Sequence, residues 1–68
     1  MPVWSLKFFR DLRSQPPSRI GYISCASEEE VAQRALERMA DEEAVRVEIC
    51  RVLLHPLILA DGAEYWLD

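Results

Sequence analysis

The chain of 68 residues is poor in the residues on which disulfide-rich and metal-binding domains depend. Its two cysteines, Cys25 and Cys50, do not form a C-x-x-C pair, whereas secreted domains of this size usually carry more cysteines. We therefore expect two reduced, largely buried thiols rather than a disulfide. The single histidine, His55, excludes a multi-histidine metal site within one chain, and the two glycines stand apart, so there is no glycine-rich phosphate loop. We expect no metal and no cofactor.

Long uninterrupted apolar runs are also missing. The longest apolar stretch, residues 53–60, contains His55 and Pro56 and is far shorter than the roughly 20 residues that a membrane-spanning helix needs. Charged residues interrupt the N-terminal region, where a secretory signal would need an apolar run. The sequence therefore predicts a soluble, cytoplasmic protein that forms a single domain, residues 1–68, with no membrane partner.

Two β-strands are predicted near the N-terminus. Residues 3–9 (VWSLKFF) alternate between two faces, and residues 19–26 (RIGYISCA) are rich in β-forming residues. The segment between them contains two prolines, which cannot extend a strand ladder. We expect the two strands to pair as a hairpin, with arginines at the tip of a long connection.

A helix is predicted to begin after Ser27, within the segment CASEEEVAQRALERM. The Ser27 hydroxyl can accept a bond from the Glu30 amide, and the Glu30 carboxylate can return it, which is a capping box. Glu28 and Glu29 lie in the first turn, where the helix dipole favours negative charge by roughly 0.3–1 kcal/mol each. Helix structure thus explains the acidic run without a metal or catalytic site, and Arg34 stands at the favourable spacing from Glu30 for a surface ion pair. The apolar stripe comprises Val31, Ala32, Ala35, Leu36 and Met39.

Two more strands are predicted in the C-terminal third. Residues 45–50 alternate between an apolar and a polar face, and the phase slips at Arg51. A β-bulge near that point would produce the slip, and so would a strand that runs past the edge of its covering helix. Asp61 and Gly62 predict a two-residue hairpin with a type I′ turn. The apolar set before the slip is Val45, Val47 and Ile49.

The order of these elements predicts an α+β fold of two layers, in which one helix packs on an antiparallel sheet of four to five strands in the order β-β-α-β-β. One helix can cover only one sheet face, and half of the residues are apolar. We therefore expect exposed apolar surface that binds another protein or a second copy, a homodimer being the simplest case. The alternative is a strongly curled sheet that wraps its own apolar side chains. The predicted interface residues are Phe9, Val52, Leu54, Leu57, Leu59 and Trp66.

Charge is unevenly distributed along the chain. The first 26 residues carry four basic residues against one acid, whereas the remainder carries four arginines against eleven acids. The overall net charge of −4 argues against nucleic acid as a partner. The alternative is a small nucleic-acid-binding module that uses the arginine-rich N-terminal hairpin, with neighbouring aromatic residues stacked on bases. An acidic helix face could equally meet a basic partner. The predicted charged contact surface comprises Arg10, Arg13, Arg19, Glu28, Glu29, Glu37 and Asp41.

The sequence offers little support for catalysis. A cysteine–histidine nucleophile would need His55 beside Cys25 or Cys50, together with an orienting group. The His55-Pro56 pair is more simply the end of a strand. A domain of this size also has little room for a substrate pocket, so we expect no small-molecule substrate and predict a non-catalytic protein.

Three segments resemble a broad class of small phage and mobile-element proteins: YISCASEEEVAQRA, VRVEI and DGAEYWLD. Proteins of that class place one helix on a short antiparallel sheet and end in a glycine hairpin with a tryptophan. Some are anti-CRISPR proteins, which inhibit bacterial RNA-guided surveillance complexes. The resemblance covers roughly residues 20–68, as a pattern of element order and residue type. It implies an inhibitor that binds a host protein complex, although several anti-CRISPR proteins of this pattern have basic sheet surfaces and this chain is acidic.

Overall fold

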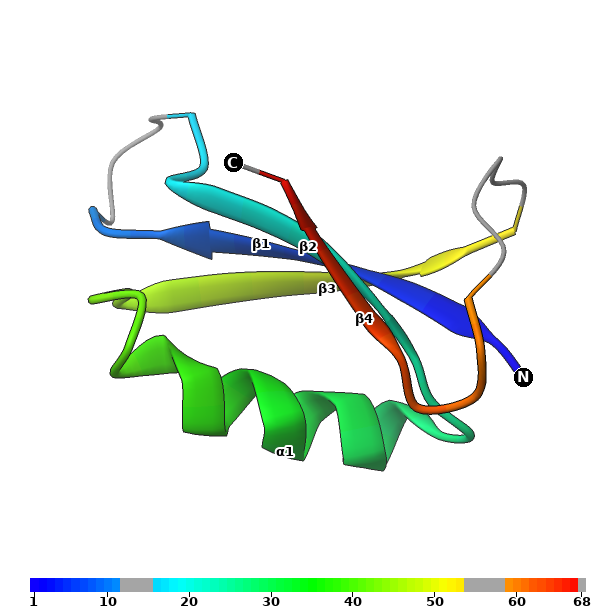
Figure 1. Cartoon of the computed structure of the whole chain (residues 1–68). Helices are drawn as coiled ribbons and strands as arrows, with labels where there is room; N and C mark the ends of the chain where they lie inside the picture. Colours follow the sequence, from blue (N-terminus) through cyan, green and yellow to red (C-terminus); the bar gives the residue numbers. More distant parts are fainter. Residues whose placement is uncertain (12–15, 54–58, 68) are drawn as a thin grey trace.

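One helix lies against one face of a twisted four-stranded sheet in the computed structural model (Figure 1). The structure describes residues 1–11, 16–53 and 59–67. The strand order is β3-β1-β2-β4, and every neighbouring pair is antiparallel. The predicted α+β class and the order β-β-α-β-β are thus confirmed, with four strands in the described residues. The elements are β1 (Val3–Phe9), β2 (Arg19–Ser24), α1 (Glu28–Met39), β3 (Arg46–Val52) and β4 (Glu64–Leu67).

The core lies between α1 and the face of the sheet that carries Leu6 and Phe8, at the centre of β1. Both residues are fully buried because β1 has a strand on each side and the helix beneath it. The predicted hairpin of β1 and β2 is confirmed, with Val3 opposite Ser24 at one end and Phe8 opposite Arg19 at the other. The buried core cluster comprises Leu6, Phe8, Ile23, Cys25, Val31 and Ala35.

The Ser27 cap of the predicted capping box is confirmed, but two other helix residues differ from expectation. The Glu30 amide donates to Ser27 Oγ over 3.2 Å, so Ser27 is the N-cap. The helix ends without glycine, through Glu43 in the left-handed region with a φ of 55°. Leu36 is 66% exposed and does not join the buried stripe. Arg34 bonds to β4 instead of forming the predicted pair with Glu30.

The register between β1 and β3 decides between the two explanations for the phase slip at Arg51. Pairing runs without interruption from Phe9 opposite Arg46 to Val3 opposite Val52, so there is no bulge. Arg51 lies on the helix side of the sheet and is exposed, because the far end of β3 extends away from α1 (Figure 1). The strand therefore runs past its covering helix.

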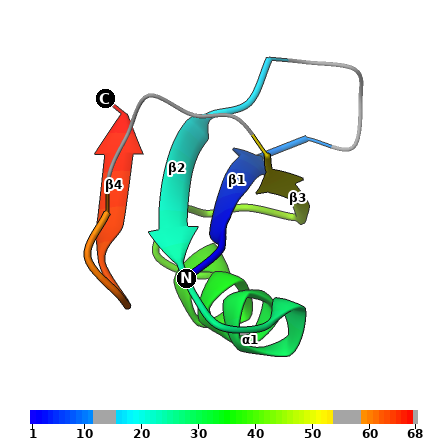
Figure 2. The ribbon, with the colours of Figure 1, turned by 90° about the vertical axis from the view of Figure 1, so that its right-hand side faces the viewer.

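The predicted hairpin at Asp61 and Gly62 is wrong in the described residues. The Ala63 amide donates to the Ala60 carbonyl over 2.9 Å, and Gly62 has a φ of 80°. Among the residues described, no φ is positive at Asp61, as a type I′ turn would require, so the turn has the pattern of type II. Moreover, β4 pairs with β2 at the opposite edge of the sheet from β3 (Figure 2). Leu59 lies outside any strand.

Candidate protein-binding surfaces

Trp66 fills the space beneath β2 and β4, because α1 packs mainly against β1 and β3. The indole rests on Gly21, its cross-strand partner, where a Cβ atom would lie 2.1 Å from Trp66 Cε3. Only glycine permits this approach. The ring also packs against Phe8, with centroids 5.8 Å apart and planes tilted by 40°. Trp66 thus extends the core beyond the width of the helix.

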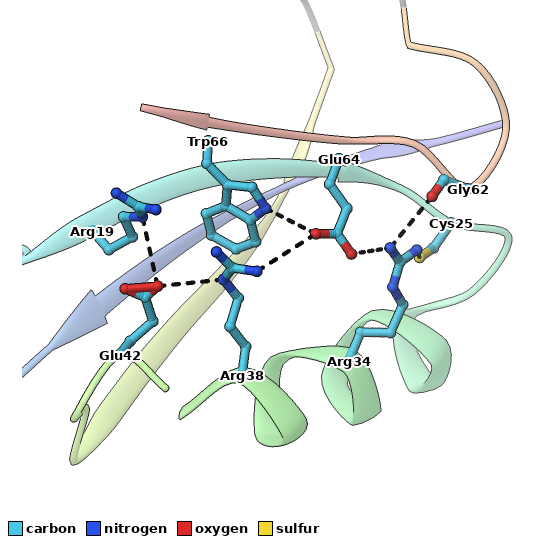
Figure 3. Close-up of polar contacts among 8 residues, drawn as sticks. All are labelled: Arg19, Cys25, Arg34, Arg38, Glu42, Gly62, Glu64 and Trp66. Carbon is cyan, nitrogen blue, oxygen red and sulfur yellow. Dashed lines mark hydrogen bonds and ion pairs between the residues drawn. The ribbon is translucent and has the colours of Figure 1, made fainter. Parts of the chain in front are cut away.

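A charged cluster surrounds Trp66 and joins the helix to the last strand (Figure 3). We call it the Glu64 network; its members are Arg19, Arg34, Arg38, Glu42 and Glu64. Trp66 Nε1 donates to Glu64 Oε1 over 2.8 Å, and Arg34 donates to the other oxygen of the same carboxylate. The Arg38 guanidinium lies 3.9 Å from the centroid of the Trp66 ring, in a cation–π contact. Arg38 thus covers the partly buried indole, while Arg34 holds the carboxylate to which the indole donates.

The network also fixes the ends of three elements. Arg34 donates to Cys25 Sγ and to the Gly62 carbonyl, each over 3.3 Å, and so joins α1 to the residues that flank β2 and β4. Glu42, just beyond the helix, lies 3.4 Å from Arg38 Nε and 3.5 Å from Arg19 Nε. The charges are paired in series, which is why arginine and glutamate can pack closely here.

The pKa values of Glu64 and Arg34 move away from neutrality. Partial burial would raise the pKa of Glu64, but the hydrogen bonds from Trp66 and Arg34 and the nearby positive charges outweigh it and lower that pKa. Partial burial opposes charge on Arg34, yet the bonds to Glu64 and Cys25 raise its pKa. A general acid or base needs a pKa near the working pH, so both shifts favour a structural role over proton transfer.

A hollow of about 180 Å³ lies beside the network. Acids and bases share its walls, so their charges largely neutralise one another. No group of three His, Cys, Asp or Glu side chains that could hold a metal ion occurs within the described ranges. Likewise, no described helix is long and apolar enough to cross a membrane. The hollow is lined by Ile23, Arg34, Glu37, Arg38, Asp41 and Glu64.

The opposite face of the sheet carries a different kind of surface. Two cross-strand pairs, Ile20 with Leu67 and Tyr22 with Tyr65, lie side by side on β2 and β4. We call these four residues the aromatic patch. Tyr65 is 42% exposed and Leu67 is 39% exposed, and their partners on β2 are half-buried. Figure 2 shows α1 on the other side of the sheet, so the helix does not cover the patch.

The predicted interface residues do not form one surface. Trp66 lies on the helix side of the sheet and packs against the core, which corrects its assignment to a binding face. Phe9 lies on the open face but is only 6% exposed, since Arg46 covers its ring at 4.0 Å. Val52 and Leu59 are half-buried. Two further predicted residues, Leu54 and Leu57, lie outside the described residues.

The predicted charged surface is likewise divided. Arg10 and Arg19 both contact Glu42, the former by donating to its backbone carbonyl over 3.2 Å, so they do not form a free basic edge. Glu28 and Glu29 are exposed in the first helical turn, as their capping role predicts. The remaining members are Glu37 and Asp41, which line the hollow, and Arg13, which lies outside the described residues.

The charged residues that connect α1 to β4 were not identified from the sequence. Arg34, Arg38 and Glu42 stand four residues apart along one flank of the helix, which is a detectable row. Their partner Glu64 lies at a sequence distance that no local pattern reveals. The thiols were also only partly anticipated: both are free, Cys25 is buried, and Cys50 is exposed on β3.

Comparisons with protein-family models, with curated proteins and with solved structures each give no significant match to this chain. The similarity to anti-CRISPR proteins therefore stays a prediction from element order and residue type.

Proposed function

We propose that the protein is a non-catalytic interaction module that binds another protein through the aromatic patch (Ile20, Tyr22, Tyr65 and Leu67). One observation carries the proposal: two neighbouring cross-strand pairs of large apolar side chains stay at least partly exposed on the sheet face opposite α1. Tyrosine is enriched at protein interfaces, because a large apolar ring is combined with a hydroxyl that can remain hydrated or bond to a partner. The patch has this composition.

The surroundings of the patch indicate the chemistry of the partner. Lys7 lies opposite Ile20 on β1, and Glu48 lies opposite Lys7 on β3; both are exposed on the same face. An apolar centre with a charged margin is the usual anatomy of a protein interface. The partner therefore presents apolar side chains at its centre and polar groups of both signs at its rim.

A phage-type inhibitor of a host protein complex is one concrete form of this proposal, and the resemblance to anti-CRISPR proteins motivates it. The competing nucleic-acid hypothesis loses support, because two of its arginines, Arg10 and Arg19, are already held by Glu42. The Glu42 carboxylate also offsets part of their positive charge, and phosphate binding depends on that charge.

The test uses two variants of the tagged full-length protein. The partner is first recovered in a pull-down from the source cells. The Kd of each variant for that partner is then measured by titration. The double variant Tyr65→Lys with Leu67→Lys places two charges in the patch. The control, Leu53→Lys, changes an apolar residue that is 80% exposed elsewhere on the surface. We expect the double variant to raise the Kd for the recovered partner by at least about tenfold, and the control to leave it unchanged. Equal recovery with both variants would refute the patch as the binding surface.

A further inference from the structure

We propose that the outer edge of β3 binds a second copy of this chain, in antiparallel register with Ile49 opposite Ile49 of the second copy. The two sheets then become continuous, and both helices lie on the same face. This surface is distinct from the aromatic patch on β2 and β4, so the inference does not depend on the proposed function.

The hydrogen bonding of β1 shows which backbone groups of β3 face outward. The Cys25 amide donates to the Pro2 carbonyl over 3.1 Å, so the even-numbered residues of β1 bond to β2 and the odd-numbered ones to β3. Their partners on β3 are likewise every second residue, from Arg46 to Val52. The amides and carbonyls of Val47, Ile49 and Arg51 therefore point away from β1, at an edge with no further strand among the described residues.

The β3 edge lacks two of the devices that usually block strand addition, although it carries the charged residues Arg46, Glu48 and Arg51. It contains no proline, and its register is uninterrupted over the whole strand. At the other edge, β4 spans only Glu64–Leu67, and short strands are poor templates for pairing. Of the two edges, β3 offers the longer row of backbone groups.

An exposed apolar flank accompanies this edge. Helical geometry places Leu36 on the opposite side of the buried stripe from Arg34 and Arg38, which reach toward β4. Leu36 thus lies on the flank of α1 toward β3, and it is 66% exposed. Val45, which precedes β3, is 54% exposed. A second copy added to β3 brings its own helix alongside this flank and covers both side chains.

The sequence of β3 selects the register. Directly opposed residues of an antiparallel sheet share a face, so symmetric registers centre on one residue. Centring on Ile49 pairs all the outward groups, with Val47 opposite Arg51 of the second copy and Glu48 opposite Cys50 of the second copy. Centring on Glu48 instead opposes two like charges, which is unfavourable. Centring on Cys50 leaves Val47 paired with Leu53, which lies outside β3.

A disulfide can report this register directly. In the proposed dimer, Glu48 and Cys50 of the second copy form a pair without mutual hydrogen bonds, whose Cα atoms lie about 4.5 Å apart. That separation is within the range that disulfides span. We therefore expect Glu48→Cys, with Cys50 retained, to form a covalent dimer under mild oxidation. The double variant Glu48→Cys with Cys50→Ser should not do so, and neither should the wild type through Cys50 alone.

Sedimentation of the unmodified protein gives the independent readout. We expect a concentration-dependent dimer whose dissociation constant rises at least about tenfold in Arg51→Pro, because proline removes an outward amide and none that bonds to β1. Arg51→Ala is the matched control and should dimerise normally. Leu36→Glu, at an exposed position, is a second disrupting variant should the proline variant fold poorly. A monomer at all concentrations, or a cross-link that persists in the Cys50→Ser background, would overturn the proposal.

Discussion

The two edges of the sheet differ in what covers the apolar side chains on their helix side. At the β4 edge, where the helix does not reach, Trp66 and the Glu64 network complete the layer beneath the sheet. At the β3 edge the helix is close, yet Leu36 and Val45 remain exposed. One edge is closed by the chain's own aromatic and charged side chains, and the other is left with apolar groups that a second molecule can cover.

The comparison of the two edges shows how a four-stranded sheet can be covered when its one helix reaches only part of its width. Arginine is suited to the role, because its flat guanidinium stacks on an aromatic ring while its aliphatic stem covers apolar surface. Arg38 does both, lying over Trp66 and reaching Glu42 and Glu64. Part of the apolar excess that the sequence presents is therefore absorbed internally, and among the described residues other apolar side chains are exposed on the open sheet face and near the β3 edge.

The largest effect on stability should come from a substitution at Gly21 that disrupts the packing of Trp66 at the β4 edge. In Gly21→Ala, the new methyl group would occupy the position of the Trp66 indole, since the Cβ atom would lie 2.1 Å from Trp66 Cε3. The ring must then leave Phe8 and Arg38. We expect the free energy of unfolding to fall by about 2–3 kcal/mol, as in overpacked cores, measured by urea denaturation.

A double-mutant cycle checks the cause of that loss. If the clash with Trp66 is responsible, Gly21→Ala should cost much less in the background of Trp66→Ala, so that the two changes are strongly non-additive. Equal costs in both backgrounds would mean that the loss comes from the backbone of β2 and not from the indole.

A second pair of variants compares the two flanks of the helix. Arg38→Ala removes the cover over Trp66 together with contacts to Glu42 and Glu64. We expect it to lower the free energy of unfolding of the monomer by about 1 kcal/mol, because the side chain is partly exposed and its ion pairs are screened. Leu36→Ala, on the opposite flank, should change that value by less than about 0.5 kcal/mol.

The same two variants should affect dimerisation in the reverse order, with the larger effect from Leu36→Ala. Leu36→Ala should weaken the association measured by sedimentation, whereas Arg38→Ala should leave it unchanged in the folded fraction. A finding that both variants affect stability and association equally would remove the distinction between the two edges.

Much of the fold was accessible from sequence because its signals are local. Alternation predicts β1, the serine cap predicts the start of α1, and both follow from contacts within a few residues. The position of β4 was not accessible in this way. Asp61 and Gly62 suggest a local hairpin, yet the strand after them pairs with β2, and only tertiary packing decides that choice.

The surfaces were harder to predict than the fold for a related reason. Trp66 looks like an exposed aromatic until its contact with Gly21 is known, and that contact joins residues distant in sequence. Leu36 has the spacing of a core residue, but the narrow contact between α1 and the sheet leaves it outside. Periodicity identifies which residues share a side of a helix, and it cannot give the width of the surface that covers them.

The smallest expected effect is a pH dependence confined to the closed edge. The folded-state pKa of Glu64 is lowered below its ordinary value of 4.5, so its ionised form contributes stability above that pH. The contribution is lost as the pH falls through the folded-state pKa. Because the Glu64 side chain is 34% exposed, solvent screening keeps this contribution below about 1 kcal/mol.

The variant Glu64→Gln tests this effect by urea denaturation at a series of pH values. We expect the wild type to be the more stable at neutral pH and the difference to shrink progressively below pH 4.5, where the wild-type carboxylate takes up its proton. Glu37→Gln removes a carboxylate from the same hollow without touching the bonds to Trp66 and Arg34, so it should not reproduce that pH profile. A difference between wild type and Glu64→Gln that stays constant from neutral to acidic pH would show that the charge of Glu64 does not stabilise the β4 edge, and that the indole and the arginine stems close it by packing alone.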